Sequence, residues 1–537
     1  MPLETESPLE LTGHGLTLET IVSVARDRAF VALHSDALGR IEAGRAVVEH
    51  YLVEGREAYG LTTGLGARVE VRVSEDALAD FSLHTIRGRA NAVGPRLPSD
   101  AVRAAMLVRA NGIACGGSGA RPEVAEALVA ALNARVEPVV PEIGSTGAGD
   151  LCVLAHIGLA LIGEGEAQIG ETQAGRAVLP AREALARAGL APLALAPKDG
   201  LALINATAAS AACGALALHD ARALLEAAQV AAALAFEGFR ANLTSIDPRV
   251  AAARPAPGQA ACAAGLRALL ADGALTRPGT SRRLQDPLSF RCTSQVHGSL
   301  AAALDLLAAA LEPELNGAGD NPLVLSEDGE IVSTGNFHTP ALALAADAVA
   351  LGLAQVGNLA VARSGRLLVE PLTGLSANLA APGTSGAGMA PLLKVADALT
   401  HAAAPICLHA RGGSDAVEDD STGSLLAVRR LATMLDRLRL LVALHLVVAA
   451  RAVELARPEP LGGGTAAAYA VVSELVEPLS ADRPLGVDVE RVAGEGLASG
   501  RLLAAVDAGL LHAPSQSGTR ASHASLTSGS LRDIKGR

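Results

Sequence analysis

Residues 424–455, SLLAVRRLATMLDRLRLLVALHLVVAARAVEL, indicate the fold more clearly than any other stretch of the chain. Five of its residues recur at helical spacing and share one face: Leu431, Leu435, Leu438, Val442 and His445. Four of its charged residues lie off that face: Arg430, Asp436, Arg437 and Arg439. With a rise of 1.5 Å per residue, the helix would be roughly 45–50 Å long. Such a length is typical of a helix bundle, often one that several subunits share.

The composition points to the same class of fold. The chain has 537 residues; 50% are hydrophobic, only 2% are aromatic, and tryptophan is absent. The core must therefore consist of Ala, Leu and Val, and Ala and Leu are strong helix formers. Charged residues make up 19%, too few for a disordered or coiled-coil chain. We predict an all-α fold in one large domain or two to three intimate ones.

Working outward from this helix, the pattern divides the chain into three parts. Residues 20–58 and 74–136 are predicted to be helical, with helix starts at Ser99 and Pro122. Residues 59–73 are predicted to end in a short strand, and residues 1–20 form a loose leader. The predicted domains are 1–200, with the active-site loops, and 201–514, a helix bundle. Residues 515–537 form a polar, disordered tail.

Charge and cysteine usage exclude several classes of partner. The formal net charge is -12 and no dense basic stripe occurs, so nucleic acid and anionic membranes are poor candidates. The apolar stretch 440–450 is too short to span a membrane, and the acidic start is not a secretory signal. The six cysteines are far apart and form no CxxC pair. We expect a reduced, cytoplasmic protein without disulfides and without a metal site.

Five segments interrupt apolar surroundings with glycines or polar residues. They are YGLTTGLG (59–66), GSTGAGDLCVLAH (144–156), GLALINAT (200–207), QDPLSFRCTSQ (285–295) and the pair DNPLV and GNFH (320–338). In this order and spacing they resemble the aromatic amino-acid lyases, a family of histidine, phenylalanine and tyrosine ammonia-lyases and aminomutases. The resemblance covers roughly residues 15–510. It is strongest to histidine ammonia-lyase, as judged by DNPLV, GNFH and the acidic segment Val417-Glu418-Asp419.

The resemblance implies a fold and a chemistry. The fold is a long helix bundle with a smaller N-terminal domain, assembled as a homotetramer whose active sites each take residues from three subunits. In the family an internal Ala-Ser-Gly tripeptide cyclises and loses water to form a methylidene-imidazolone (MIO). The Ser side chain becomes an electrophilic methylene, which captures the substrate amine and makes it a leaving group. The substrate is a small molecule.

The chain departs from the family at the tripeptide itself. Where the family has Gly-Ala-Ser-Gly-Asp-Leu, this chain has Gly147, Ala148, Gly149, Asp150 and Leu151, so the Ser is missing. No side chain at Ala148 or Gly149 can be dehydrated to a methylene, and we expect no MIO cofactor to form. Asp150 matches a loop residue for which we favour a structural role. The segment 145–147 offers another tripeptide, but on the wrong side of the loop. A second departure is Leu288, which replaces a family Tyr in QDPLSF.

Other family positions are retained. Tyr59 matches the catalytic Tyr base; its alternative is an ordinary turn tyrosine. Asn205 matches the amide beside the prosthetic group, although a core Asn with satisfied hydrogen bonds is nearly as good an explanation. Arg291 matches the arginine that binds the substrate carboxylate through two parallel hydrogen bonds. The alternative for Arg291 is a structural ion pair.

Several residues match positions that line the substrate pocket. They are Asn316, Asn336, Phe337, Arg89 and Glu418. Arg89 replaces a family His, and Asp420 replaces another. An Arg facing Glu418 suits a polar or zwitterionic substrate, unless the two simply pair with each other. His84 and His338 are candidate proton carriers, but a lone His is more often structural.

Three functions remain open. The first is an enzyme that eliminates, adds or isomerises without MIO, with Tyr59 as base, on a small carboxylate or amino-acid-derived substrate. Such a substrate would need an acidic proton or a better leaving group than ammonia. The second is a non-catalytic homologue with a binding or assembly role. The third is an ordinary ammonia-lyase with an atypical MIO tripeptide.

Overall fold

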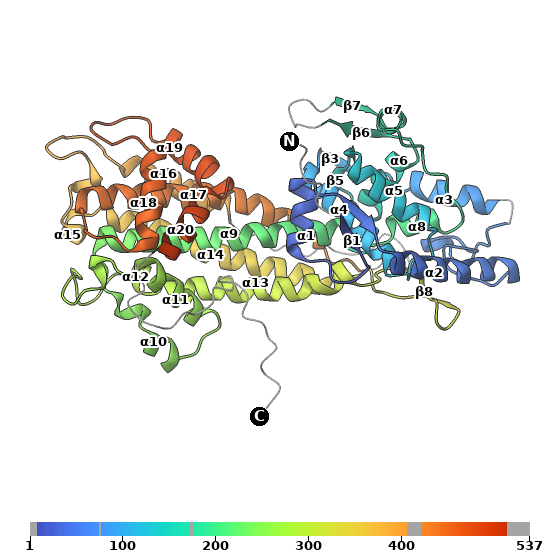
Figure 1. Ribbon diagram of the computed structural model, residues 1–537, viewed down its shortest axis with the longest axis horizontal. Coiled ribbons are helices and arrows are strands. Elements are labelled where there is room, and N and C mark those ends of the chain that lie inside the picture. Colours follow the sequence, from blue (N-terminus) through green and yellow to red (C-terminus); the bar gives the residue numbers. More distant parts are fainter. Residues whose placement is uncertain (1–7, 75–76, 171–176, 405–419, 513–537) are drawn as a thin grey trace. The chain divides into compact units, whose positions relative to one another are not determined.

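The computed structural model describes residues 8–74, 77–170, 177–404 and 420–512 (Figure 1). This part of the chain is mostly helical with a few short strands, which confirms the predicted all-α class. The helix predicted from residues 424–455 is α17, Ser424–Ala456. Its predicted inner face is buried, because Leu431, Leu435, Leu438 and Val442 are each at most 3% exposed.

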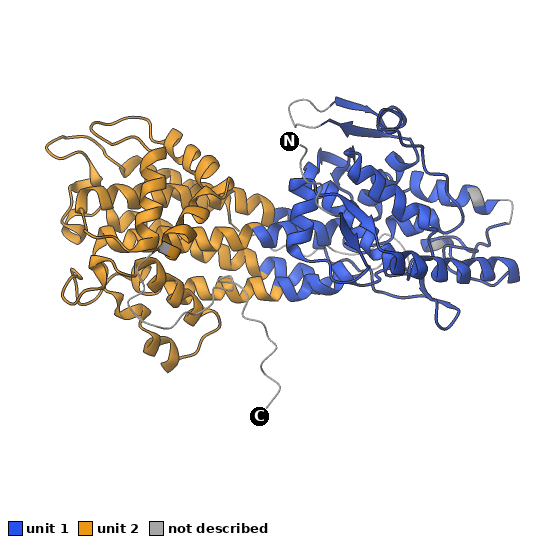
Figure 2. Ribbon diagram, viewed as in Figure 1, with its two compact units in different colours: residues 1–219, 307–347, 407–430 blue, residues 220–306, 348–406, 431–537 orange. Residues whose placement is uncertain are grey.

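The described chain forms two compact units (Figure 2). Unit 1 comprises residues 1–219, 307–347 and 407–430, and unit 2 comprises 220–306, 348–406 and 431–537. Four of the five unit boundaries fall inside the long helices α9 (Ala208–Phe239), α13 (Thr293–Asn316), α14 (Pro340–Leu367) and α17. The predicted domain ranges 1–200 and 201–514 stay a prediction, and the predicted tail, residues 515–537, lies outside the described residues.

Unit 1 holds the remaining N-terminal helices and the strands. The helices are α1 (Leu18–Val22), α2 (Ser35–Glu54), α3 (Leu78–Arg87), α4 (Ser99–Ala114), α5 (Pro122–Asn133), α6 (Leu151–Leu161), α7 (Ala181–Arg187) and α8 (Asp199–Ile204). The predicted helix starts at Ser99 and Pro122 are confirmed, and proline at the first helical position needs no N–H partner there. Residues 101–114 of α4 are all buried, so this helix forms the centre of the unit. α5 packs against it, while α3, α6 and α8 pack on one another.

The strands of unit 1 form small sheets. They are β1 (Leu9–Leu11), β2 (Val31–Leu33), β3 (Val93–Arg96), β4 (Val136–Pro138), β5 (Pro141–Ile143), β6 (Glu166–Ile169), β7 (Ala177–Pro180), β8 (Leu323–Leu325) and β9 (Glu330–Val332). β1 pairs in parallel with β2, while the pairs β3–β5, β4–β6–β7 and β8–β9 are antiparallel. The pair β3–β5 places the loop after β5 at the start of α6.

Unit 2 adds shorter helices to its share of the long ones. They are α10 (Pro248–Ala253), α11 (Gln259–Leu270), α12 (Leu288–Arg291), α15 (Glu370–Thr373), α16 (Ala390–Ala402), α18 (Gly463–Leu475), α19 (Gly486–Arg491) and α20 (Arg501–His512). Its core consists mainly of Leu, Ala and Val side chains, as the composition predicted.

Three local predictions were wrong. The ranges 20–58 and 74–136 are not helical throughout, because β2 interrupts the first and β3 the second. Residues 8–20 are not a loose leader: β1 pairs with β2, and Leu11 and Leu16 are buried. Residues 59–73 contain turns and one bridge between Thr63 and Arg72, but no strand. β1 is a strand because the distant β2 pairs with it, and residues 59–73 form no strand because no partner strand among the described residues lies beside them; local alternation of residues could predict neither.

Three helical stretches are long and apolar enough to cross a membrane, judged by length and composition. They are Asp199–Phe239, Thr293–Asn316 and Pro340–Leu367. The sequence prediction considers only residues 440–450 as a possible membrane span, and it does not include these three stretches. The apolar window of the first is completely buried within the protein, as expected of a helix at the centre of a bundle. The windows of the other two are 39% and 50% buried.

Candidate active site

The loop that lacks the family serine is held by Asp150, which is completely buried. The Asp150 carboxylate accepts hydrogen bonds from Ser145 Oγ (2.7 Å), Ser210 Oγ (2.8 Å) and the Ser210 N–H (2.7 Å). The Asp150 N–H donates to the Ala206 carbonyl at 2.8 Å. Burial raises the pKa of Asp150, and the hydrogen bonds from Ser210 and Ser145 oppose that rise. Asp150 therefore joins the loop to the chain segment after α8.

Gly147 and Gly149 give the loop its path. Both have positive φ angles, +91° and +76°, which favour glycine. The Gly149 N–H donates to the Phe337 carbonyl at 3.2 Å, and Ala148 forms a bridge with His338. On the other side, Thr422 Oγ1 donates to the Gly147 carbonyl at 3.0 Å. A Cβ added at Gly147 would collide with the Thr422 hydroxyl, so the contact requires glycine.

The residues of this loop do not fit an MIO group. Ala148 and Gly149 offer no hydroxyl that could leave as water, and the Ser145 hydroxyl is bound to Asp150. Thr146, the central residue of the alternative tripeptide, is exposed, and its carbonyl accepts the Gly423 N–H at 2.8 Å.

Asn205 follows α8 directly and faces the loop. A Cβ built on Gly149 would lie 3.5 Å from Asn205 Oδ1, so the amide oxygen is beside this glycine. The Asn205 Nδ2 donates to the Asn321 carbonyl. The structure therefore brings Asn205 to Gly149, as the resemblance implied.

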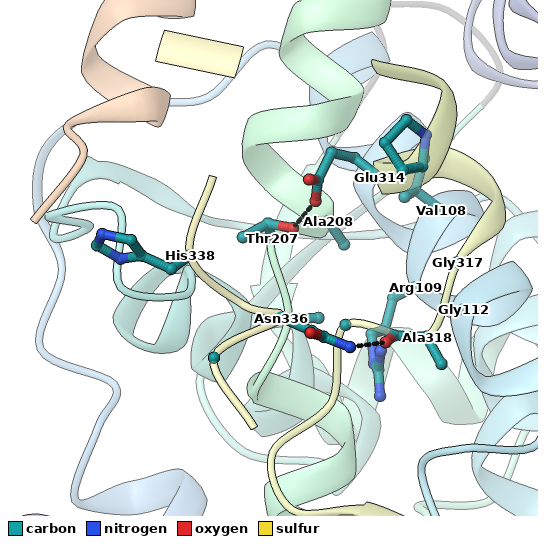
Figure 3. Close-up of a pocket in the computed structure, with 14 residues that line it drawn as sticks. Val108, Arg109, Gly112, Thr207, Ala208, Glu314, Gly317, Ala318, Asn336 and His338 are labelled. Carbon is teal, nitrogen blue, oxygen red and sulfur yellow. Dashed lines mark hydrogen bonds between the residues drawn. The ribbon is translucent and has the colours of Figure 1, made fainter. Parts of the chain in front are cut away.

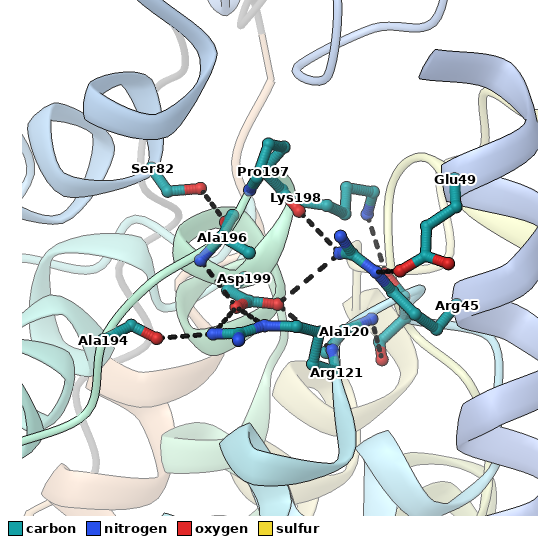
Figure 4. A network of polar contacts seen from close by, with 11 residues as sticks. Arg45, Glu49, Ser82, Ala120, Arg121, Ala194, Ala196, Pro197, Lys198 and Asp199 are labelled. Atoms are coloured by element: carbon teal, nitrogen blue, oxygen red, sulfur yellow. Dashed lines mark hydrogen bonds and ion pairs between the residues drawn. The ribbon is translucent and has the colours of Figure 1, made fainter. Parts of the chain in front are cut away.

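The start of α8 is fixed by a network of charged side chains around the buried Asp199 (Figure 4). Asp199 accepts hydrogen bonds from Arg121 Nε at 2.8 Å and from the N–H groups of Arg121 (3.1 Å) and Ala196 (2.8 Å). Arg45 Nη1 lies 3.8 Å from Asp199 Oδ1. Lys198 donates to the carbonyls of Ser118 and Pro322, and burial lowers the pKa of Lys198 to about 8.

Replacing Asp199 with Asn should lower the free energy of unfolding by about 3–5 kcal/mol, because it leaves two arginines next to a neutral buried group. Urea denaturation followed by circular dichroism measures the change. Glu49→Gln is the matched control: it removes the exposed carboxylate on Arg45 and should cost about 0–1 kcal/mol. A loss for Asp199→Asn as small as that of the control would show that the network does not stabilise α8.

Tyr59 lies in the turn after α2 and is half-buried. Its hydroxyl oxygen accepts the Gly66 N–H at 3.0 Å. The neighbouring Gly60 packs so closely on Leu201 of α8 that a Cβ there would collide with the leucine. The turn that carries Tyr59 therefore lies against the helix that leads to Asn205.

A pocket of about 420 Å³ opens beside the loop (Figure 3). Its polar lining includes Arg109, Thr207, Glu314, Asn336 and His338. Figure 3 shows the Glu314 carboxyl turned toward Thr207, whose Oγ1 donates to Glu314 Oε2 at 2.9 Å. Asn336 Nδ2 donates to the Ala318 carbonyl at 3.4 Å, and His338 Nε2 lies 3.0 Å from Asp420 Oδ2.

The sequence motifs did not identify two charged residues of this pocket, Glu314 and Arg109. Burial raises the pKa of Glu314 to about 7; Asp150 raises it further, and the Thr207 hydroxyl lowers it. Arg109 is buried and forms an ion pair with Asp320 at 2.7 Å. The available signal for Glu314 was a carboxylate just after Pro313, near the end of an apolar helix. Its hydrogen-bond partner Thr207 was not singled out either, although it stands at the end of the motif GLALINAT.

Arg291 and Leu288 belong to unit 2, on α12. Arg291 is half-buried. With the oxygen of its amide turned toward the guanidinium, Gln285 accepts hydrogen bonds from Arg291 Nη1 (3.0 Å) and Nη2 (3.3 Å). Within the described ranges, no carboxylate pairs with Arg291, so the alternative of a structural ion pair has no support there. Leu288 is 61% exposed.

The other predicted pocket residues differ in their surroundings. Phe337 is half-buried beside Gly149, and Asn336 is exposed at the pocket. Asn316 exchanges hydrogen bonds with the backbone of Leu16, at 2.6 and 3.1 Å, which indicates a structural role. Arg89 is half-buried. Its predicted partner Glu418 lies outside the described residues, so that pairing stays a prediction.

Comparison with known proteins agrees with this geometry. The family model described as aromatic amino acid lyase matches residues 16–474. A histidine ammonia-lyase of Symbiobacterium thermophilum is 41% identical over 510 residues, covering 93% of this chain and 98% of that protein. The ergothionase of Treponema denticola superposes with a TM-score of 0.87 at 29% identity, covering 93% of this chain and all of the other. The tyrosine aminomutase of Streptomyces globisporus reaches 0.87 at 30% identity, covering 94% and 99%. The chain thus belongs to the aromatic amino acid lyase family and is an enzyme of the carbon–nitrogen lyase class.

Proposed function

We propose that this enzyme eliminates an amine that already carries a full positive charge, without an MIO group. The substrate class is an α-trimethylammonio carboxylate, a betaine of a histidine-like amino acid. The products are a neutral tertiary amine and an unsaturated carboxylate. The observation that carries the proposal is the loop at Ala148 and Gly149, which has no serine to supply an electrophile.

The chemistry of the leaving group supports this substrate class. An MIO group serves to turn a poor leaving group, ammonia, into a better one, and a trimethylated nitrogen leaves as a neutral amine without such help. The solved structure from Treponema denticola is described as an ergothioneine-degrading enzyme. Ergothioneine is the trimethylammonium betaine of a thiohistidine. The likeness to histidine ammonia-lyases supports a ring of similar size on the β-carbon.

Each proposed step has a residue for it. In the family's tetramer one active site takes residues from several subunits, and we propose that in such an assembly the Arg291 guanidinium binds the substrate carboxylate, with Gln285 of the same unit holding its orientation. The Tyr59 oxygen accepts the β-proton. The electron pair of the broken Cβ–H bond forms the Cα=Cβ double bond, and the Cα–N bond breaks with its pair remaining on nitrogen. Asn205, beside Gly149, orients the group that leaves.

We also propose that the enzyme is a homotetramer, as in the family. Leu344 and Leu351 of α14 are one heptad apart, on one face, and are 69% and 50% exposed. Exposed leucines at this spacing are typical of a helix face that another helix covers.

Intact mass spectrometry should give the unmodified mass of the chain, and the peptide that contains residues 144–151 should carry no loss of water. A histidine ammonia-lyase with Ala-Ser-Gly, digested in the same way, is the control and should lose two waters. In parallel, N,N,N-trimethyl-L-histidine and ergothioneine should release trimethylamine, at least about 100-fold faster than L-histidine releases ammonia. A loop that has lost two waters, or faster turnover of L-histidine, would refute the proposal in favour of an ordinary ammonia-lyase.

A further inference from the structure

We infer that Glu314 binds the positively charged amine group of the substrate, in the pocket beside the loop 144–151. This inference rests on the proposed function and adds to it the residue that recognises the leaving group. It concerns a side chain that none of the sequence motifs singled out.

Among the described residues, no positively charged side chain, whether Lys, Arg or His, forms an ion pair with the Glu314 carboxylate. Its hydrogen bond is to the neutral Thr207 hydroxyl, at 2.9 Å. The cation on the opposite wall, Arg109, is already neutralised by Asp320 at 2.7 Å, and its Nε donates to the Ala202 carbonyl. A carboxylate in a concave pocket without a counter-charge is a site for a cationic ligand.

The position of Glu314 joins it to the candidate active site. Three consecutive residues after α8 make the connection. Asn205 Oδ1 faces Gly149, the Ala206 carbonyl accepts the Asp150 N–H, and the Thr207 hydroxyl donates to Glu314. Two residues that line the pocket, Ala206 and His338, therefore contact the loop segment where the family has its electrophile: the Ala206 carbonyl accepts the Asp150 N–H, and His338 forms a bridge with Ala148. In the family, the electrophile is the group that captures the substrate amine.

The walls of the pocket suit a methylated ammonium group. Apart from the polar residues already named, the lining consists of small or apolar residues, among them Val108, Ala206, Ala208 and Pro313. A trimethylammonium group has no N–H to donate, so it needs apolar contact and a nearby negative charge rather than hydrogen-bond acceptors. A volume of about 420 Å³ is ample for this group.

The electrostatics predict that proton release accompanies binding. Burial and Asp150 raise the pKa of Glu314 to about 7, so without ligand the carboxyl is partly protonated at neutral pH. A bound cation favours the carboxylate and lowers that pKa, so a proton leaves as the ligand binds. Affinity should therefore rise as the pH rises through about 7.

The other charged groups around Glu314 are already held by partners of their own. Asp150 accepts three hydrogen bonds, Arg109 pairs with Asp320, and His338 pairs with Asp420. Glu312, on the same helix, is exposed and accepts from Asn316 Nδ2 at 3.1 Å.

The test is isothermal titration calorimetry on the full-length protein in the Tyr59→Phe background, in which turnover should be about 10²–10⁴-fold slower than in the wild type. The probes are N,N,N-trimethyl-L-histidine and urocanate, which share the ring and carboxylate but differ in the ammonium group. Titrations in buffers of different ionisation enthalpy count the protons released. Glu314→Gln keeps an acceptor for Thr207 and removes the charge; Glu312→Gln is the matched control.

Glu314→Gln should weaken binding of the betaine at least about tenfold at pH 8, which corresponds to about 1.4 kcal/mol. It should abolish proton release and leave urocanate binding unchanged, while Glu312→Gln changes none of these. Equal weakening of both ligands, proton release that persists in Glu314→Gln, or failure of the betaine to bind would each overturn the inference. If wild-type enzyme and Glu314→Gln release trimethylamine with equal kcat/KM, the inference fails while the proposed function stands. If wild-type enzyme releases none, the proposed function fails.

Discussion

Replacing Tyr59 with Phe should lower kcat for trimethylamine release by about 10²–10⁴-fold, the usual contribution of a positioned general base. The substitution removes a single oxygen, which among the described residues accepts only the Gly66 N–H, so the fold should be retained. KM should change little, because the proposed contact of Tyr59 is to the proton that moves in the transition state. Steady-state kinetics with a coupled assay for trimethylamine measures both constants.

The control for this experiment is Tyr469→Phe, which removes the hydroxyl of a half-buried tyrosine on α18 of unit 2. It should leave kcat and KM unchanged. Wild-type activity in Tyr59→Phe would remove Tyr59 from the mechanism and leave the proton acceptor to be found elsewhere. Circular dichroism of both variants separates a catalytic effect from loss of structure.

Replacing Arg291 with Gln should lower kcat/KM for the betaine by about 30- to 1,000-fold, since loss of one partner of a hydrogen-bonded charge pair costs about 2–4 kcal/mol. Most of the effect should appear in KM, because the carboxylate is bound equally in the ground and transition states. Arg291→Lys keeps the charge but loses the paired donors. Its kcat/KM should therefore lie between those of wild-type enzyme and Arg291→Gln.

Arg249→Gln is the control for Arg291, because Arg249 is an exposed arginine of unit 2 that pairs with Asp247. A substrate analogue without the carboxylate should bind equally to wild-type enzyme and to Arg291→Gln. If Arg291→Gln weakens binding of this analogue as much as that of the betaine, Arg291 acts on the fold and not on the carboxylate.

The helices could largely be predicted from the sequence, because their signals are local. α17 follows from one apolar face repeated over many turns, and α4 and α5 begin where Ser99 and Pro122 predict. The pairing of β1 with β2 could not be predicted, since the strands are three residues each and their partners are distant in sequence. The strand expected in residues 59–73 failed for the same reason: alternation without a partner does not make a strand.

The missing serine, Leu288 and the retained Tyr59, Asn205 and Arg291 are all visible in the sequence, because each is a residue type at a motif position. The sequence therefore sufficed to predict the family and to indicate that the serine needed for its electrophile is missing. Glu314 and Arg109 carry no such motif, and an acidic or basic residue in a helix is normally a solvated one. Only the tertiary structure places Glu314 beside Thr207 and neutralises Arg109 with Asp320, over 211 residues of chain. Burial and charge pairing depend on which distant segments meet, and that is a property of the packed fold rather than of any stretch of sequence.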